Sequence, residues 1–538
     1  ILIQDLTYPA SYWNANTLSW QDTPVYSTSV VTGTKPDYNW QLTALPEWQH
    51  AKTYLIVSQA KDYSTPQLSQ DVFVVGISSK LFTYDIDKPT SVLTLPQANA
   101  YYNRETIATI SGTAYDLPAG IQVVEFALQE VASGKYWNAT ASTFNLVSIQ
   151  YYSGTNISGN IWGWATPVDY LQDGYQYRAY IRAIDNAGNI EDEKIGVLFT
   201  FDISSPVAVV TLPSPNAHYN LLPTISGTAY DAGRLLKVEL AVRELDTGLW
   251  YNISASTFNL VSVTPVWFDA KPLVADWSVW YSTEVVLQSD YRYEVRARAK
   301  DTAGNIQDAG ITPISFVYDL TRPTATISAP VHQRFYKSAQ LVTISGTAYD
   351  KSPGEVVTVN LMIFNETTNR YWDGDSWELT AVWLTTTTTP GEKVYYWAEG
   401  SSWTYTLPDA AKTSGNKYVV TAKAIDKAKN AQEDFEVGIS SCVFYYDVGY
   451  PLTSVTYPSN QYLNSIDVIS GTAQDQPQAA GLYNVGISTT PADNIKIRIA
   501  QLRPDATYYW TGVAWSSTTV SDRPCSPVDP TNPEYTYW

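Results

Sequence analysis

Cysteine is nearly absent from this chain, since Cys442 and Cys525 are the two in 538 residues. A disulfide framework or a thiolate zinc site needs more cysteines than these, so both are excluded. Histidine is almost as rare, with three residues that occupy unrelated places: His50, His218 and His332. The chain also lacks GxSxG, HExxH, GxGxxG and phosphate-loop motifs. The sequence therefore predicts that this protein is not an enzyme.

Basic residues and long apolar runs are scarce as well. There are 33 Lys and Arg against 52 Asp and Glu, which gives a net charge of −19. Nucleic acids and anionic membranes would repel such a chain, whereas cations would be attracted. No apolar run approaches the roughly 18 residues of a membrane helix. We therefore expect neither a nucleic-acid partner nor membrane insertion in this segment.

What the chain does contain is repetition. The string TISGTAYD ends at Asp116, Asp231 and Asp350, and the related VISGTAQD ends at Asp475. A second marker, an aromatic residue followed by Asp-x-x-x-Pro, places further aspartates at 85, 202, 319 and 447. These aspartates are 117, 117 and 128 residues apart, and a repeat of that length is a whole domain. The predicted units are residues 1–84 (the C-terminal part of a unit), 85–201, 202–318, 319–446 and 447–538 (the N-terminal part of a unit). We expect the chain to be a stretch of a longer tandem array.

Each unit alternates apolar and polar residues with the period of a β-strand. Val124, Phe126 and Leu128 alternate with polar neighbours after the first TISGTAYD, and no long stretch has a helical apolar period. The tail strand has the same alternation, with Tyr177 and Ile181 among its apolar face. Strands with one apolar face are what a sandwich of two sheets requires. The predicted fold class is all-β, built from tandem sandwiches in an elongated array.

A motif at the end of the units carries a resemblance. Tyr-x-φ-x-φ-x-Ala-x-Asp-x-Ala-Gly-Asn, where φ is apolar, occurs at 177–189 and 293–305. With ISGTAxD, it resembles the immunoglobulin-like and fibronectin type III-like repeats of large bacterial surface proteins and adhesins. The resemblance implies tandem Ig-like sandwiches, extracellular or at the cell surface. The inter-sheet cysteine pair of true immunoglobulin domains is absent.

Immunoglobulin-like sandwiches often have a tyrosine early in strand F that hydrogen-bonds to a nearby corner. The residues in the corresponding place are Tyr54, Tyr177, Tyr293 and Tyr418. Either this role or simple packing in the core would account for them.

The recurring aspartates are expected to converge. If ISGTA forms strand B and the tail forms strand F, both run toward the pole at which strand A begins. The predicted sets are Asp85, Asp116 and Asp185; Asp202, Asp231 and Asp301; and Asp319, Asp350 and Asp426. Carboxylates so close repel one another unless a cation compensates, and Ca²⁺ takes six to eight oxygen ligands. Asn189 and Asn305 could add ligands. The alternative is that each aspartate accepts hydrogen bonds from its own turn.

Tryptophan and tyrosine recur in the middle of each unit. The tryptophans of the shared Tyr-Trp motif are Trp13, Trp137, Trp250, Trp372 and Trp510. Such residues pack cores, form contacts between subunits or stack on sugar rings.

Because every feature is copied in each unit, we expect a mechanical or adhesive role: a stalk, fibre, filament or sheath of an extracellular surface protein. Its partners would be copies of itself or neighbouring repeats, a surface polysaccharide, or a host or partner cell. The alternative function is a tandem carbohydrate-binding array that uses exposed Trp and Tyr. No cofactor is required, and Ca²⁺ at the domain junctions is one of the two interpretations of the aspartates.

Overall fold

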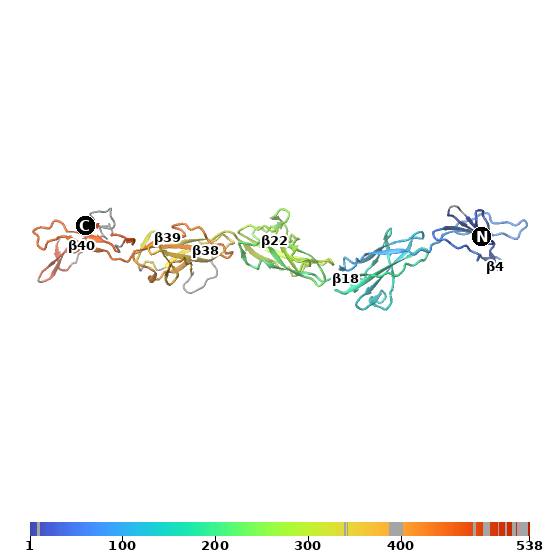
Figure 1. Ribbon diagram of the computed structural model, residues 1–538, viewed down its shortest axis with the longest axis horizontal. Coiled ribbons are helices and arrows are strands. Elements are labelled where there is room, and N and C mark those ends of the chain that lie inside the picture. Colours follow the sequence, from blue (N-terminus) through green and yellow to red (C-terminus); the bar gives the residue numbers. More distant parts are fainter. Residues whose placement is uncertain are drawn as a thin grey trace.

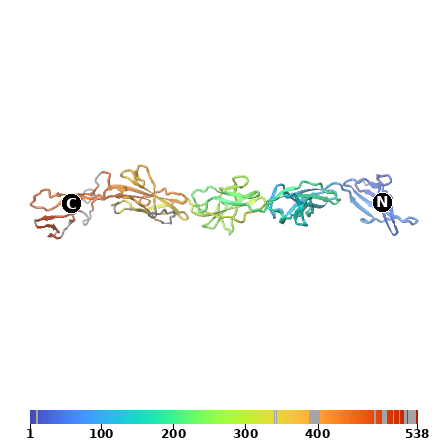
Figure 2. The same cartoon turned by 90° about the horizontal axis from the view of Figure 1, so that it is seen from below.

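The chain is all-β, and its units follow one another along a single axis. A computed structural model describes residues 1–538 except 8–10, 338–339, 342, 387–401, 477–479, 488–494, 504, 512–513, 519–522, 525–535 and 538, so Cys525 lies outside the described residues. Two perpendicular views show the elongated shape, with the two ends of the chain far apart (Figures 1 and 2). The helical turns in the described part are the short 3-10 elements η1 (Val168–Tyr170) and η2 (Asp409–Ala411).

Among the described residues, no helix is long and apolar enough to cross a membrane.

Residues 90–201 form the first complete sandwich. Its strands are β8 (Thr90–Leu95), β9 (Ala100–Tyr102), β10 (Thr109–Tyr115), β11 (Ile121–Glu130), β12 (Lys135–Asn138), β13 (Thr143–Leu146), β14 (Tyr152–Ser153), β15 (Thr155–Ser158), β16 (Ile161–Ala165), β17 (Gln176–Asp185) and β18 (Val197–Phe201). One sheet has the order β15-β16-β10-β8, and the other has the order β13-β12-β11-β17-β18-β9, with β14 beside β11. Strand β9 runs parallel to β18, with Ala100 opposite Phe199, while the other pairs are antiparallel.

The next sandwich repeats this plan. Its strands are β19 (Val207–Leu212), β20 (His218–Tyr219), β21 (Ile225–Tyr230), β22 (Leu235–Glu244), β23 (Trp250–Asn252), β24 (Thr257–Leu260), β25 (Phe268–Asp269), β26 (Lys271–Pro272), β27 (Val279–Ser282), β28 (Tyr291–Asp301) and β29 (Ile314–Tyr318). The two sheets are β19-β21-β27-β26 and β20-β29-β28-β22-β23-β24, and β25 pairs with β22. Strand β20 is again parallel to the last strand of its unit, β29.

A third sandwich follows with the same order. Its strands are β30 (Thr324–Ala329), β31 (Arg334–Tyr336), β32 (Thr343–Tyr349), β33 (Val356–Asn365), β34 (Arg370–Trp372), β35 (Trp377–Glu378), β36 (Leu384–Thr385), β37 (Ser402–Thr406), β38 (Asn416–Asp426) and β39 (Ser441–Tyr446). They form the sheets β30-β32-β37 and β31-β39-β38-β33-β34-β35, with β36 beside β33.

The regions at the two ends contain fewer strands of this plan. The first has β1 (Leu2–Asp5), β2 (Ser11–Asn14), β3 (Ser19–Gln21), β4 (Val30–Thr34), β5 (Asp37–Gln41), β6 (Thr53–Val57) and β7 (Ser79–Thr83). They form one sheet, β3-β2-β1-β6-β7, and the separate hairpin β4-β5. The last has β40 (Leu452–Tyr457), β41 (Ser470–Gln474), β42 (Lys496–Ile497), β43 (Ala500–Leu502), β44 (Thr507–Trp510), β45 (Trp515–Ser516), β46 (Arg523–Pro524) and β47 (Thr536–Tyr537). Strand β41 lies between β40 and β47.

The predicted alternation forms the cores. Val124, Phe126 and Leu128 of β11 are fully buried, and they pack in one cluster with Tyr177 and Ile181 of β17. The corresponding positions of the next two units are buried in the same way. The two-sheet sandwich predicted from the period-two pattern is therefore confirmed.

The glycine of ISGTA explains why this string recurs. A Cβ on Gly227 would lie 2.0 Å from the Val209 carbonyl oxygen and 2.2 Å from the Trp280 ring. Trp280 is fully buried against this strand, and its Nε1 donates to the Thr228 carbonyl oxygen at 3.1 Å. In the third sandwich, Gly346 and Trp403 repeat the close approach. The glycine thus lets a tryptophan of the neighbouring strand cover the backbone of strand B.

The corner tyrosines have the predicted hydrogen bond. The Tyr54, Tyr177, Tyr293 and Tyr418 hydroxyls accept backbone N–H groups five residues earlier, at 3.1, 2.8, 2.9 and 2.8 Å. All four rings are also buried, so the residues fill the core as well. A second set, not predicted from the sequence, makes the same five-residue contact at the end of the second strand of each complete unit, β9, β20 and β31. These are Tyr102, Tyr219 and Tyr336, each with a distance of 2.8 Å.

Candidate metal centres at the unit junctions

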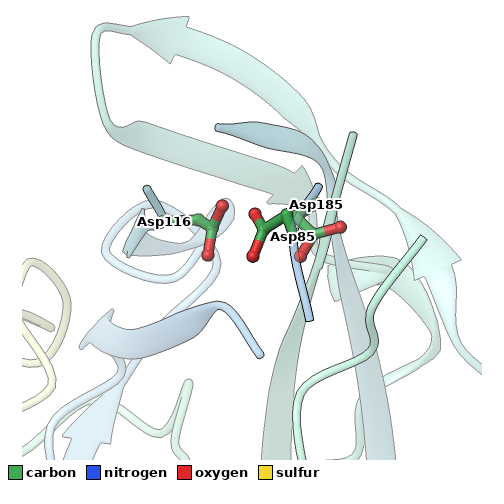
Figure 3. A group of neighbouring side chains, drawn as sticks. All are labelled: Asp85, Asp116 and Asp185. Atoms are coloured by element: carbon green, nitrogen blue, oxygen red, sulfur yellow. The ribbon is translucent and has the colours of Figure 1, made fainter. Parts of the chain in front are cut away.

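The predicted aspartates do meet, three at a time, at the start of each complete sandwich. In each set, one carboxylate oxygen per residue lies within 4.8 Å of those of the other two. The sets are Asp85, Asp116 and Asp185 (cluster 1); Asp202, Asp231 and Asp301 (cluster 2); and Asp319, Asp350 and Asp426 (cluster 3). Figure 3 shows the three side chains of cluster 1 gathered in one place. The convergence predicted from the strand directions is confirmed.

Three different elements place the side chains of each cluster. In cluster 2, Asp202 follows β18 of the preceding unit, Asp231 follows β21, and Asp301 is the last residue of β28. The Asp202 N–H donates to the Tyr102 carbonyl oxygen at 2.9 Å, and the Asp319 N–H donates likewise to Tyr219. The first aspartate of each of these clusters is therefore fixed to the preceding sandwich, and the other two belong to the following one.

The turn interactions expected from the alternative interpretation are also present. Asp185 Oδ1 accepts the N–H groups of Ala187, Gly188 and Asn189 at 2.8, 2.8 and 2.9 Å. Asp202 Oδ1 accepts the N–H of Ser204 at 3.1 Å. Asx-turn bonding and convergence thus involve the same aspartates, because each carboxylate has a second oxygen.

The asparagines act as donors in this structure, whereas we expected them to add ligands. The Nδ2 group of Asn189 donates to Asp185 Oδ2 at 2.8 Å and to the Asp85 carbonyl oxygen at 3.2 Å. Asn305 and Asn430 make the corresponding pairs of bonds in the other two clusters. This amide therefore ties the turn after the tail strand to the first aspartate of the cluster, and it orients the carboxylate of the third aspartate.

Clusters 2 and 3 contain carboxylate oxygens without a donor. Asp202 Oδ2 and Asp231 Oδ1 are buried, and neither has a hydrogen-bond partner within the described part of the chain. The same holds for Asp319 Oδ2 and Asp350 Oδ2, whose residues are 0% and 5% exposed. A buried polar atom that lacks a partner costs free energy, and an unpaired buried charge costs more. A hard cation would supply the missing interaction.

The electrostatics agree with this geometry. Burial, followed by the charges of Asp231 and Asp301, raises the pKa of Asp202 to about 6. Burial is also the largest cause in cluster 3, where the pKa values of Asp319 and Asp350 both rise to about 7. A nearby cation would oppose these shifts, because it favours the ionised carboxylates.

Glycines leave space beside the unpaired oxygens. A Cβ on Gly233 would lie 2.1 Å from Asp202 Oδ2, and one on Gly354 would lie 2.5 Å from Asp350 Oδ2 and 2.7 Å from Asp319 Oδ2. Neither glycine has a positive φ, but a Cβ on Gly354 would also lie 2.7 Å from the Lys351 carbonyl oxygen. The small residue at these positions keeps the region next to the carboxylates open, which fits a bound ion.

Cluster 1 satisfies its carboxylates in another way. Asp85 Oδ2 accepts the Ala119 N–H, and Asp116 Oδ2 accepts the Gly120 N–H, both at 3.0 Å. His50 of the preceding unit lies beside it, with Nδ1 3.2 Å from Asp85 Oδ1. Burial and the two other aspartates still raise the pKa of Asp116.

The recurring tryptophans lie in the cores. Trp13, Trp137, Trp250 and Trp372 are all less than 10% exposed, and Trp510 is half-buried. Sugar stacking needs an exposed ring face. The carbohydrate-binding alternative therefore lacks the exposed platform on which it depended at the first four of these positions.

Comparisons with known proteins give the following results. No family model matches the chain, and no curated protein matches it. Among solved structures, a tetra-tandem repeat from the extending region of a large adhesion protein is 17% identical, covering 72% of this chain and 80% of that one (TM-score 0.25). A 1.5-MDa bacterial ice-binding adhesin is 13% identical, covering 67% and 99% (TM-score 0.25). Fibronectin(III)-like modules of Clostridium thermocellum CbhA are 13% identical, covering 45% and 94% (TM-score 0.21).

Proposed function

We propose that this chain is a non-enzymatic spacer region of a large extracellular surface protein, in which calcium ions at the unit junctions stiffen an extended rod. The observation that carries the proposal is the pair of buried, incompletely satisfied aspartate clusters, 2 and 3, each built across a junction. The proposed Ca²⁺ ligands are the nine aspartates of the three clusters.

The short connections between units account for the proposed rod shape. Strand β18 ends at Phe201, Asp202 follows at once, and the next unit's β19 begins at Val207. The linker has hydrogen bonds to both neighbours, since Asp202 N–H donates to Tyr102 and Asn305 Nδ2 donates to the Asp202 carbonyl oxygen. A cation that binds one carboxylate on this linker and two on the next unit would fix the angle between the units.

As a spacer, the chain would hold a binding region away from the cell. Its partners in this role are the neighbouring repeats of the same protein or other copies in a filament. A surface polysaccharide or a partner cell would then be bound elsewhere in the assembly, because the recurring tryptophans are buried here.

The test is small-angle scattering of the purified chain, with millimolar calcium and with chelator, combined with calorimetric titration of calcium. We expect calcium binding, and a longer maximum dimension with less flexibility when calcium is present. The double variant Gly233→Ala and Gly354→Ala should lose most of this response, since each added Cβ displaces a carboxylate. The control is Ser254→Ala, at an exposed serine away from the junctions.

An absence of calcium binding at millimolar concentration would contradict the cation sites. Electron micrographs with compact particles in calcium, instead of rods or polymers, would contradict the spacer.

A further inference from the structure

The loop before each corner tyrosine lies at the junction end of its own unit, against the end of that unit's last strand, at all four junctions. The residue three positions before the tyrosine donates its N–H to the last carbonyl before the junction aspartate, at 2.8–2.9 Å. The four pairs are Ala51 to Tyr84, Gly174 to Phe201, Asp290 to Tyr318 and Gly415 to Tyr446. All four donors have a positive φ, between 63° and 84°. This conformation turns the loop toward the junction at a cost that a non-glycine residue bears only when its surroundings impose it.

The residue four positions before the tyrosine contacts the chain one residue beyond the junction aspartate. Its side chain accepts the backbone N–H of the residue immediately after the junction aspartate. The pairs are Asp173 with Ile203 at 2.8 Å, Ser289 with Leu320 at 2.8 Å, Ser414 with Val448 at 2.9 Å, and His50 with Ile86 at 3.5 Å. The residue type differs at the four junctions. The bond is short at the last three, whereas His50 Nδ1 also lies 3.2 Å from Asp85 Oδ1 and, when protonated, pairs with that carboxylate instead of accepting from Ile86.

We propose that this loop is an inter-unit clamp: the residue four positions before each corner tyrosine is a positioning residue that orients the next unit. This inference rests on the proposed spacer function. The bond crosses the junction aspartate, so the backbone on both sides of that residue is held by the preceding unit. The clamp therefore also presets the direction of the first carboxylate of clusters 1, 2 and 3.

The corner tyrosine is the rigid support of the clamp. The Tyr293 hydroxyl accepts from the Gln288 N–H and donates to the Gln288 carbonyl oxygen, at 2.9 and 3.0 Å. These bonds close the loop that carries Ser289 and Asp290. The sandwich core, in which Tyr293 is fully buried, is thereby connected to the junction.

The second and third junctions reinforce the clamp with additional contacts. At the second, Asp173 Oδ2 accepts the Ser204 hydroxyl, and Thr106 Oγ1 donates to the Ala303 carbonyl oxygen at 3.0 Å. At the third, Asp290 accepts from the Thr321 hydroxyl at 2.7 Å and from Lys351 Nζ at 2.6 Å. These contacts join side chains of one unit to the linker and to the turn after β28 at the second junction, and to the linker and the loop after β32 at the third.

The test is pulsed electron-electron resonance on the full chain, which measures distances across one junction at a time. Spin labels at Val92→Cys and Val209→Cys span the second junction, and labels at Val209→Cys and Thr324→Cys span the third; all three positions are exposed. Cys525 is replaced by serine. Cys442 stays, because it is 2% exposed and burial raises the pKa of its thiol to about 11.

The decisive variant is Ser289→Ala, which removes the acceptor of the Leu320 N–H and the hydroxyl that donates to Asp290 Oδ1, and leaves every cluster carboxylate in place. We expect a broader distance distribution across the third junction in chelator, and an unchanged one across the second. The calcium concentration that restores a narrow distribution should rise about two- to tenfold at the third junction, the effect of one lost hydrogen bond. Ser254→Ala is the matched control.

Equal distributions in Ser289→Ala and the unchanged chain, with and without calcium, would overturn the clamp. The proposed cation sites fail separately: if calcium alters neither junction but Ser289→Ala still broadens the third in chelator, the clamp stands without them. A loss of folding would be seen as reduced far-ultraviolet β signal. In that case Ser414→Ala, with the second junction as reference and labels at Thr324→Cys and Ser454→Cys, gives the same comparison at the fourth junction.

Discussion

Clusters 1 and 3 have the same three aspartates at the same places in the fold, yet their surroundings differ. In cluster 1 the backbone N–H groups of Ala119 and Gly120 approach the carboxylates, and His50 lies beside them. In cluster 3 two buried oxygens lack a donor in the described residues, and Gly354 keeps the adjacent space open. Identical acids in repeated folds thus need not be equivalent sites.

The difference originates in the B–C loop. After Asp116 the chain reads Leu-Pro-Ala-Gly, and this loop directs two N–H groups at the carboxylates. After Asp350 the chain reads Lys-Ser-Pro-Gly, and the Gly354 N–H donates to the Lys351 carbonyl oxygen at 2.7 Å instead of to a carboxylate. In cluster 2 the Gly233 N–H reaches only Asp231 Oδ2, at 3.1 Å. We infer that cluster 1 depends least on a cation, and the predictions below test this ranking.

The largest expected effect is that of calcium on the two later sandwiches. With free calcium a thousand times above Kd, a site that exists only in the folded state adds about 4 kcal/mol to the free energy of unfolding. Hydrogen exchange followed by mass spectrometry should show this gain in β28 and β38, and a clearly smaller one in β17. Equal gains in all three strands would contradict the ranking of the clusters.

The next effect is a pH dependence in chelator. The carboxyls of Asp202, Asp319 and Asp350 have pKa values of about 6, 7 and 7 in the folded chain, above the value of about 4 in an unfolded chain. Between pH 4 and these folded-state pKa values the folded chain therefore binds more protons than the unfolded chain, so the free energy of unfolding falls as pH rises. We expect the free energy of unfolding to fall from pH 5 to pH 8 on the order of 3 kcal/mol per affected unit.

Denaturant unfolding followed by tryptophan fluorescence measures this dependence. Saturating calcium should remove it or reverse its sign, because the ion keeps the carboxylates ionised. A midpoint that rises with pH in chelator would show that the clusters are not under mutual repulsion.

A smaller effect is expected for Asp202→Asn and Asp85→Asn, which should change the free energy of unfolding in opposite directions. In chelator, Asp202→Asn removes a charge from a crowded cluster and keeps the Oδ1 that accepts from Ser204. The free energy of unfolding of the unit at 202–318 should therefore rise by roughly 1–2 kcal/mol. Asp85→Asn weakens the interactions with Ala119 and His50, so the free energy of unfolding of the unit at 85–201 should fall by a similar amount. Thermal unfolding in chelator checks the two directions, and changes of the same sign would count against the comparison.

The smallest effect is that of the corner hydroxyl. Tyr293→Phe removes two hydrogen bonds to Gln288, and Tyr54→Phe removes one to Gln49. We expect losses of about 1 kcal/mol or slightly more, with the larger one in Tyr293→Phe. Calorimetric melting of the two variants in calcium measures the difference, and equal losses would mean that the second bond adds nothing.

The sequence was sufficient for the fold and for the position of the clusters. Period-two alternation specifies strands with one buried face, and the direction of strands B and F decides at which pole Asp116 and Asp185 lie. The corner tyrosines were recognisable because their spacing to the tail motif is constant. The close approach of Trp280 to Gly227, and of Trp403 to Gly346, was not anticipated, although the glycine of ISGTA is its signal.

The inequality of the clusters and the clamp could not be predicted in this way. Which carboxylate oxygens receive an N–H depends on the path of a loop of two to four residues, and alternation carries no information about such paths. The clamp residue is His, Asp or Ser at different junctions, so it has no signature in residue type. A constant offset of four residues from the corner tyrosine is the only sequence signal, and it becomes visible once the bonds are known.

The parallel pairing of β9 with β18 has a mechanical consequence. These strands lie near the entry and the exit of the same sandwich, and they are hydrogen-bonded over residues 100–102 and 199–201. When the two ends of the chain are drawn apart under tension, the strands slide along their length, so these bonds are sheared together instead of being broken one by one. Strands β20 with β29 and β31 with β39 repeat the arrangement. A tether made of such units would withstand flow while anchored at one end.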